Sequence, residues 1–278
     1  MSKLFSPSNM QKFILMFACL FLTYGLTFGG YMGYDYYAQN RDADRNRVDI
    51  EMKPAVATSD EVVVDVGQSS SESGKKKEIV DPMERRFDFA SLGDLAELAY
   101  GWVYIPDTEI DYCVMRDKVG NGKYIWSDIY GQSSSVGCIF TYDTTDDDML
   151  RVFYGHHLSG PAKMFTELHY YDDEDWANDH KYVYFYYLDR VEKWAVWSPQ
   201  YVKKNNEVYQ YPYYESEKAY KDLLDNLEDN APQLYTAAPK SDEELFVLST
   251  CDSSVNGTTG RYIVPLVKKE VKYYDEED

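Results

Sequence analysis

The chain has 278 residues, and its 48 acidic and 28 basic side chains give a formal net charge of −20 at pH 7. This excess of carboxylates argues against nucleic acid as a partner, because phosphate binding depends on concentrated Lys and Arg. The 28 tyrosines favour pleated surfaces with one wet edge, so composition predicts a single folded domain that is rich in β-strands.

The N-terminal residues indicate a membrane anchor. Residues 1–12 are short and polar, and Phe13 to Met32 contains no charged residue, which is about the length that a helix needs to cross a bilayer. Lys3 and Lys12 ahead of this run favour a cytoplasmic N-terminus. A cleaved signal peptide is the alternative, but no A-x-A pattern occurs and the run is longer than a signal core. We therefore expect a cytoplasmic tail, a transmembrane signal anchor at 13–34, and the bulk of the chain outside the cell.

Residues 35–84 are expected to form a juxtamembrane segment followed by a disordered linker. Asp35 to Val48 mixes charges and tyrosines, which is compatible with a helix that continues out of the membrane. From Lys53 to Pro82 the chain loses its aromatic residues and gains serines and lysines, a composition that cannot bury enough surface to order itself. We expect this linker to hold the folded domain, residues 85–278, away from the membrane and to let it swing.

The folded part is dominated by short apolar and aromatic runs separated by Gly, Asp and Pro, as in a protein of many strands. Two stretches, 87–100 and 215–229, instead carry apolar residues at helical spacing. A hairpin is predicted at Asp189-Arg190, and many short strands with few helices suggest a closed or nearly closed barrel. The predicted strands include 101–105, 110–114, 137–140, 182–188, 191–197, 245–250 and 261–264.

The run from Leu245 to Leu248 is apolar on both faces and predicts a buried strand that ends at Cys251. A polar loop follows, and a second apolar run opens at Arg261, so two joined strands would bring Cys251 and Arg261 together. A cysteine at a strand end is more often a packed hydrophobe than a nucleophile. Nearby positive charge reverses those odds, because it lowers the pKa of a thiol toward neutrality. Arg261 could serve that purpose or could hold an oxyanion, and both roles stay open at this point.

A second informative stretch is Tyr154-Gly155-His156-His157, which Met164-Phe165 follows after a turn. Together with Leu248-Ser249-Thr250-Cys251 and Arg261, this stretch resembles the sortases, and among sortases those of class B. The family motif at the cysteine is T-L-x-T-C, and this chain departs from it at Val247, where the first threonine is usual. The resemblance covers roughly residues 85 to 270 in order and spacing.

The resemblance implies a mostly β fold, an eight-stranded sortase β-barrel with an N-terminal helix and a helix before the cysteine strand. It also implies a membrane-anchored enzyme of gram-positive bacteria that cuts a C-terminal sorting signal of secreted proteins. The new carboxyl end would pass through a thioacyl enzyme to an amine of a cell-wall precursor or of a pilin. The partners are then the sorting substrates, the acceptor amine and the bilayer through residues 13–34, and no cofactor is expected.

Carried over position by position, Cys251 would be the nucleophile, His156 the general acid and base, and Arg261 the oxyanion or substrate clamp. These roles agree with the chemistry of acyl transfer by a thiol. Ser249, Thr250 and Leu224 are predicted to contact the substrate.

Several readings compete with these assignments. His157 would point to the face opposite His156, and residue alternation alone does not tell which ring faces Cys251. The spacing of the histidines and of Cys113 and Cys138 gives no support for zinc. These two cysteines are expected as packed thiols, although a disulfide is the alternative outside the cell. At the level of function, a pilus-polymerising class B sortase, a cysteine hydrolase and a non-catalytic binding module remain alternatives.

Overall fold

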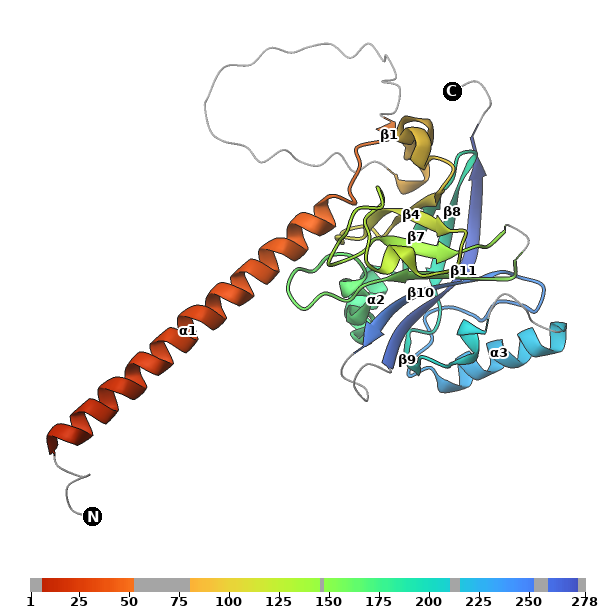
Figure 1. The fold of residues 1–278 in the computed structure, drawn as a ribbon. Coiled ribbons are helices and arrows are strands. Elements are labelled where there is room, and N and C mark those ends of the chain that lie inside the picture. The colour runs from red at the N-terminus through yellow and green to blue at the C-terminus, as the bar shows by residue number, and fades with distance from the viewer. Residues whose placement is uncertain (1–6, 53–80, 146–147, 211–215, 253–259, 275–278) are drawn as a thin grey trace, which may run out of the picture.

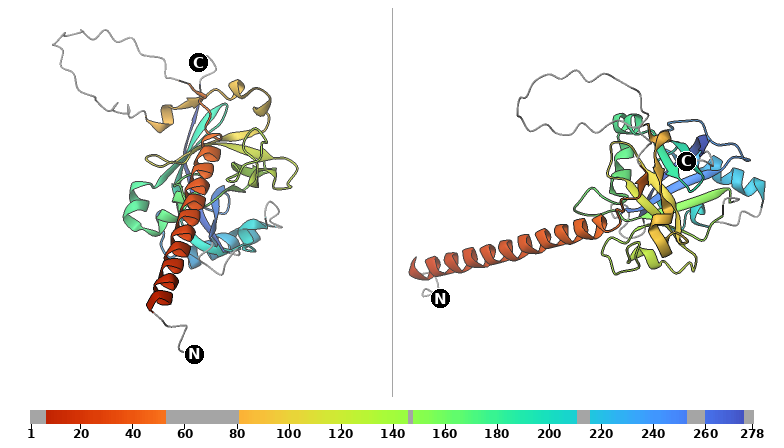
Figure 2. Two further views of the ribbon diagram at one scale, coloured as in Figure 1. Left: turned by 60° about the vertical axis from the view of Figure 1, so that its left-hand side comes forward. Right: turned by 90° about the horizontal axis from the view of Figure 1, so that it is seen from above.

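The computed structural model describes residues 7–52, 81–145, 148–210, 216–252 and 260–274. A long helix, α1 (Pro7–Asp44), projects from one side of a β-rich body, as all three views show (Figures 1 and 2). At 1.5 Å per residue this helix is about 57 Å long. Among the described residues, the stretch Met10–Asp44 is the one helix that is long and apolar enough to cross a membrane, a test that signal sequences also pass.

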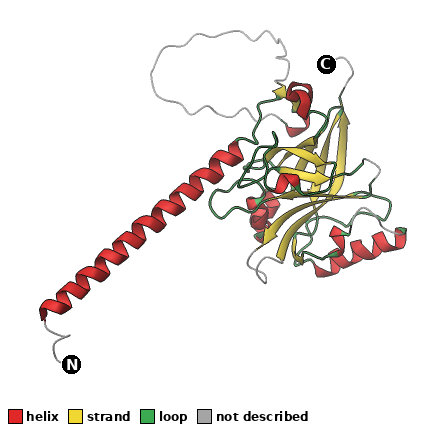
Figure 3. Cartoon of the chain, in the orientation of Figure 1, coloured by secondary structure: helices red, strands yellow, loops and turns green. Residues whose placement is uncertain are grey.

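Eight strands close into a barrel in the order β10-β6-β5-β4-β3-β7-β8-β11, because β10 also pairs with β11. A further strand, β9 (Gln200–Lys203), adds to β11 outside this ring. The prediction of an eight-stranded β-barrel is confirmed, and the strands and flanking helices can be followed in Figure 3. The ring consists of β3 (Ala99–Tyr104), β4 (Asp111–Asp117), β5 (Ile139–Tyr142), β6 (Leu150–Gly155), β7 (Tyr182–Tyr186), β8 (Arg190–Val196), β10 (Leu245–Asp252) and β11 (Gly260–Tyr273).

The barrel closes around an aromatic core. Phe246 of β10 is fully buried and stacks on Trp194 of β8 with ring centroids 3.7 Å apart. The ring centroids of Phe153 (β6) and Phe185 (β7) each lie 5.0 Å from that of Phe246. Rings of this size bury a large apolar area and fix one packing arrangement, so the strand that carries Cys251 has a rigid base.

The predicted helix at 215–229 is present as α3 (Glu217–Asn230), which begins after the capping residue Ser216. Its apolar stripe of Tyr220, Leu223, Leu224 and Leu227 is buried against the barrel. The remaining short helices are η1 (Pro82–Glu84), η3 (Lys123–Ile125), η4 (Thr166–Asp172), α2 (Glu174–Asp179) and η5 (Glu207–Tyr209).

The α-helix expected at 87–100 does not form as predicted. The structure has a short strand, β2 (Arg86–Phe87), then the 3-10 helix η2 (Phe89–Leu95), and β3 already begins at Ala99. Gly93 has φ +58° and ψ −127°, which lies outside the helical region and kinks the segment. Apolar spacing predicted side chains that are partly buried here, such as Leu92 and Leu98, but not the break in the backbone.

The folded unit also begins earlier than the predicted boundary at Arg85. Ala43 and Asn46 are 0% and 1% exposed, and β1 (Glu51–Met52) pairs with β2 in antiparallel register. The mixture of charges and tyrosines in this segment does not signal its packing, because charged side chains such as Arg47, which pairs with Glu109, bind the domain. The expected swinging linker falls almost entirely on residues 53–80, which lie outside the described residues.

Candidate active site

Strand pairing sets Cys251 opposite Arg261. The two residues are partners in the antiparallel ladder of β10 and β11, so their side chains leave the same face of the sheet. Cys251 is exposed, unlike the buried residues that precede it on β10. The strand register therefore places Cys251 and Arg261 next to each other, as the sequence predicts.

The parallel pairing of β10 with β6 brings His156 to the same end of the barrel as Cys251. Thr250 of β10 is in register with Gly155 of β6, so the next positions along the two chains are Cys251 and His156. His156 and Cys251 line the same cavity, whereas His157 is not part of that lining and contacts the ring of His169. The ring on the Cys251 side is therefore that of His156, a choice that sequence alternation left open.

Cys251, His156 and Arg261 line one cavity of about 440 Å³. The cavity is open to solvent at the strand ends, and the side chain of Lys204 adds a second cation to its lining. The rest of its wall is largely aromatic and is built by Trp126, Phe140, Tyr142, Tyr154 and Tyr209. A site with few polar groups on an apolar, concave wall suits a peptide side chain next to a reactive carbonyl.

His156 is held by a backbone carbonyl and an indole ring. Its Nε2 lies 2.8 Å from the carbonyl oxygen of Ile125, and its ring lies 5.2 Å from that of Trp126. A carbonyl can only accept, so Nε2 carries the proton and Nδ1 is the nitrogen that remains for proton transfer. Burial lowers the pKa of His156 below its ordinary value, and the Ile125 carbonyl opposes that shift in part.

Arg261 directs its charge toward two tyrosines of the cavity wall. Burial raises the pKa of Tyr209 to about 12 and raises that of Tyr154 further, and the Arg261 charge counteracts both shifts. Nη1 of Arg261 also donates to the carbonyl of Gly260 at 2.8 Å. The guanidinium therefore sits at the cavity with part of its fork fixed by the main chain.

The three predicted substrate contacts have different positions. Ser249 and Thr250 line the cavity, although both are almost fully buried. Ser249 Oγ and the Tyr209 hydroxyl are hydrogen-bonded at 2.7 Å, whereas Thr250 Oγ1 has no hydrogen-bond partner among the described residues. Leu224 is 4% exposed, packs in the core beneath α3 and is not part of the cavity lining.

One contact of the strand that carries Cys251 comes from His169, a residue to which the sequence analysis gives no role. Its Nε2 lies 3.2 Å from the carbonyl oxygen of Cys251, and its ring stacks on Tyr262 at 4.9 Å. The ring centroid of His157 lies 4.2 Å from that of His169, so the second histidine of the motif packs on a residue that contacts the main chain of Cys251. No local pattern around His169 signals this, because the contact depends on how η4 packs against β11.

The remaining cysteines give no metal site. Cys113 and Cys138 are both free and buried, and burial raises the pKa of the Cys113 thiol to about 12. Cys138 forms part of the cavity wall but is buried too, which keeps its thiol protonated and unreactive. Across the described ranges, no group of three or more His, Cys, Asp or Glu side chains is placed to hold a metal ion.

The comparisons with known proteins point to one family. No family model matches the chain. Sortase B of Listeria monocytogenes is 26% identical over 188 residues, which covers 65% of this chain and 74% of that protein. Sortase B of Staphylococcus aureus is 25% identical over 182 residues, covering 64% and 73%.

Solved structures agree with these relatives. Clostridium perfringens sortase B superposes with a TM-score of 0.60 at 19% identity, over 66% of this chain and 100% of that one. The Staphylococcus aureus sortase B–substrate complex superposes with a TM-score of 0.58 at 23% identity, over 67% and 85%. At such identities the superpositions establish a shared fold.

Proposed function

We propose that this chain, which is similar in sequence to sortase B of Listeria monocytogenes and shares the fold of solved class B sortases, is a membrane-anchored cysteine transpeptidase for proteins with a C-terminal sorting signal. The observation that carries this proposal is the convergence of Cys251, His156 and Arg261 on one open cavity from three separate strand ends. A solved relative is a complex with its substrate, which supports a peptide as the ligand of such a cavity.

In the proposed reaction the Cys251 thiolate attacks the scissile carbonyl carbon and forms a C–S bond. The negative charge that develops on the carbonyl oxygen is stabilised by the Arg261 guanidinium. Protonated His156 gives a proton to the leaving amine as the C–N bond breaks, which leaves a thioacyl enzyme. An incoming amine then attacks the thioester, neutral His156 takes its proton, and the thiolate departs.

Anchoring belongs to the same proposal. The apolar stretch of α1 would cross the membrane with the N-terminus in the cytoplasm and the barrel outside the cell. The acceptor would be an amine of the cell wall of a gram-positive bacterium, or of a pilin if the enzyme polymerises pili.

The test uses the full chain in detergent micelles and a pool of sorting-signal peptides with randomised motifs. We expect cleavage that requires Cys251 and a product in which an added amine replaces water. Cleavage without amine incorporation would favour the cysteine hydrolase. If no peptide is cleaved and Cys251 resists iodoacetamide in the folded protein, the binding module would be favoured instead.

A further inference from the structure

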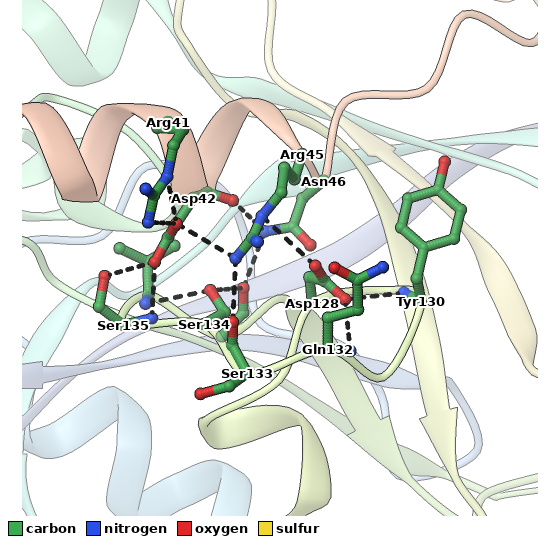
Figure 4. Close-up of polar contacts among 12 residues, drawn as sticks. Arg41, Asp42, Arg45, Asn46, Asp128, Tyr130, Gln132, Ser133, Ser134 and Ser135 are labelled. Atoms are coloured by element: carbon green, nitrogen blue, oxygen red, sulfur yellow. Dashed lines mark hydrogen bonds and ion pairs between the residues drawn. The ribbon is translucent and has the colours of Figure 1, made fainter.

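The last turns of α1 contact two loops of the barrel that flank His156. Figure 4 shows the polar contacts with one of these loops, between Asp42, Arg45 or Asn46 of the N-terminal segment and residues such as Asp128 and Ser135. The first, the 126–138 loop, connects η3 to β5 and begins one residue after Ile125, whose carbonyl binds the His156 ring. The second, the 156–165 loop, starts at His156 itself and leads to η4. A helix that holds both loops is placed to fix the histidine from two sides.

Charged side chains at the end of α1 bind the 126–138 loop through hydrogen bonds and an ion pair. Asp42 Oδ2 accepts from the amide of Ser135 at 3.0 Å and from its hydroxyl at 2.8 Å. Arg45 Nη2 donates to the carbonyl of Ser133 at 3.0 Å, and Arg45 Nε lies 3.4 Å from Asp128 Oδ2. Burial would raise the pKa of Asp42, but the bonds from Ser135 and Arg41 outweigh it and hold the pKa below its ordinary value.

Asn46, which follows α1, bonds the same loop at two points. Its Nδ2 donates to the carbonyl of Gly137 at 2.7 Å, and its Oδ1 accepts from the amide of Ile129 at 3.1 Å. Asn46 is 1% exposed, so these are buried main-chain groups with a dedicated side-chain partner. Such groups are costly to leave unpaired, and the pairing fixes where the loop lies.

The 126–138 loop, which α1 holds, in turn packs against the Ile125 carbonyl that binds His156. The amide of Ser134 donates to the carbonyl of Trp126 at 3.0 Å, and that of Cys138 donates to Tyr124 at 3.1 Å. Gly137 has φ +59°, and a Cβ there would lie 2.5 Å from the Ile125 oxygen. The main chain at Gly137 therefore lies directly against the peptide whose oxygen accepts from the His156 ring.

The same helix also contacts the 156–165 loop. Lys163 Nζ and Asp44 Oδ1 form an ion pair at 2.5 Å, and Gly160 packs so close to Tyr36 that a Cβ would lie 2.9 Å from its ring. The loop returns to its start because the amide of Phe165 donates to the carbonyl of His156 at 3.1 Å. Both main-chain flanks of the histidine thus depend on α1.

We propose that Arg45, Asn46 and Asp42 are positioning residues for His156, and that the end of α1 is part of the catalytic unit. They act through the Ile125 carbonyl, which selects the ring nitrogen that bears the proton and sets the ring's orientation toward Cys251. This inference rests on the proposed function for its meaning in catalysis, but its geometry and its test do not require a substrate.

If the 126–138 loop is held less firmly, the direction in which the pKa of His156 shifts can be predicted. The Ile125 carbonyl favours the protonated ring, so its displacement lowers the pKa of His156 beyond the lowering that burial causes. The other groups that could influence the ring are those of the shared cavity. The titratable or charged side chains in its lining are Cys138, Tyr142, Tyr154, Lys204, Tyr209, Cys251 and Arg261.

The test compares two arginines on the same helix in the full chain. Both arginines form an ion pair with Asp42, and the Arg41 side chain is 53% exposed. Arg45→Ala in addition removes the hydrogen bond to Ser133 and the ion pair with Asp128, so the two variants differ in their contacts with the 126–138 loop. The chain has four histidines, so ring-labelled protein in micelles gives a short set of imidazole resonances to titrate by NMR. Thermal unfolding of each variant checks that it is folded.

We expect the pKa of His156 to fall by about half a unit or more in Arg45→Ala and to change little in Arg41→Ala. Arg45→Lys should recover part of the difference, because an ammonium can reach one of the two acceptors. An unchanged His156 pKa in folded Arg45→Ala, or an equal shift in Arg41→Ala, would overturn the proposal.

If Arg45→Ala does not fold, Lys163→Ala supplies the same test from the other loop, because it removes only the ion pair with Asp44. We expect a smaller fall in the His156 pKa, and no fall would count against the proposal. These titrations contain no sorting peptide, so their failure is distinguishable from a failure to find transpeptidation.

Discussion

The cavity around Cys251 and the end of α1 are held together by different kinds of contact. Around the cavity, Cys251 and Arg261 extend from strands whose buried residues are mostly aliphatic or aromatic, and Cys251 itself is exposed. At the end of α1, buried polar groups join positions far apart in the chain, such as Asp42 and Ser135, which are 93 residues apart. The difference teaches that the reacting groups and their support lie in different regions. Substitutions around Cys251 should therefore affect activity with little effect on stability, whereas those at the end of α1 should affect stability first and activity through the position of His156.

The largest expected effect on activity comes from removing the nucleophile. Cys251→Ala should reduce peptide cleavage by at least about 10³-fold, because the other thiol in the cavity lining, Cys138, is buried and its pKa is raised by that burial. Its unfolding free energy should stay within about 0.5 kcal/mol of wild type, since the side chain is exposed. Cleavage kinetics and urea denaturation measure the two quantities.

Cys113→Ala is the matched control, because Cys113 is a buried thiol that does not line the cavity. It should retain activity while losing about 1 kcal/mol of stability. Near-normal cleavage by Cys251→Ala would refute the role of the exposed thiol.

The cation opposite the nucleophile should come next. Arg261→Ala should lower kcat/KM by about 10²-fold or more, since a charge facing the developing oxyanion is lost. Arg261→Lys keeps the charge but not the planar fork, so intermediate activity is expected. Steady-state kinetics with a cleaved sorting peptide would settle the order, and equal rates for all three proteins would speak against any catalytic role.

In the other region, the main effect should be on stability. Asn46→Ala leaves the Gly137 carbonyl and the Ile129 amide without their partner, which should cost about 1–3 kcal/mol of unfolding free energy. Asn40→Ala on the same helix removes only a bond to the Tyr36 carbonyl within α1 and should change stability by less than about 0.5 kcal/mol. Urea denaturation of the full chain in micelles measures the unfolding free energy of both variants. Equal losses in Asn46→Ala and Asn40→Ala would contradict a stabilising role of the Asn46 contacts with the 126–138 loop.

The two regions also differ in how far sequence could predict them. Buried runs such as Leu245–Leu248, with Cys251 and Arg261 at their ends, carry both a strand pattern and a family motif, so the barrel and the cavity residues were predictable. Leu224 was misplaced because a helix near a groove offers two faces, and periodicity does not say which one the substrate meets. The docking of Asn46 was not predictable, because a polar side chain that binds main-chain groups leaves no apolar pattern.

The smallest expected effect is a dependence of stability on pH. Burial keeps the pKa of His156 in the folded protein below its value in the unfolded chain, so folding favours the neutral ring. The corresponding stability is present above the unfolded pKa and is lost as pH falls through the folded pKa. Unfolding free energy measured from roughly pH 7.5 to 5 should therefore fall less steeply in His156→Gln than in wild type. Identical slopes would contradict the desolvated environment of this ring.

The central claim, that Cys251 holds the acyl group before an amine takes it, can be tested by intact-protein mass spectrometry. The full chain would be mixed with the randomised sorting peptides, sampled, and then given an excess of amine. The account predicts an acyl adduct that maps to Cys251, that is absent from Cys251→Ala, and that is discharged as an amine conjugate. Cleavage of peptides without such an adduct, or an adduct on another residue, would contradict it.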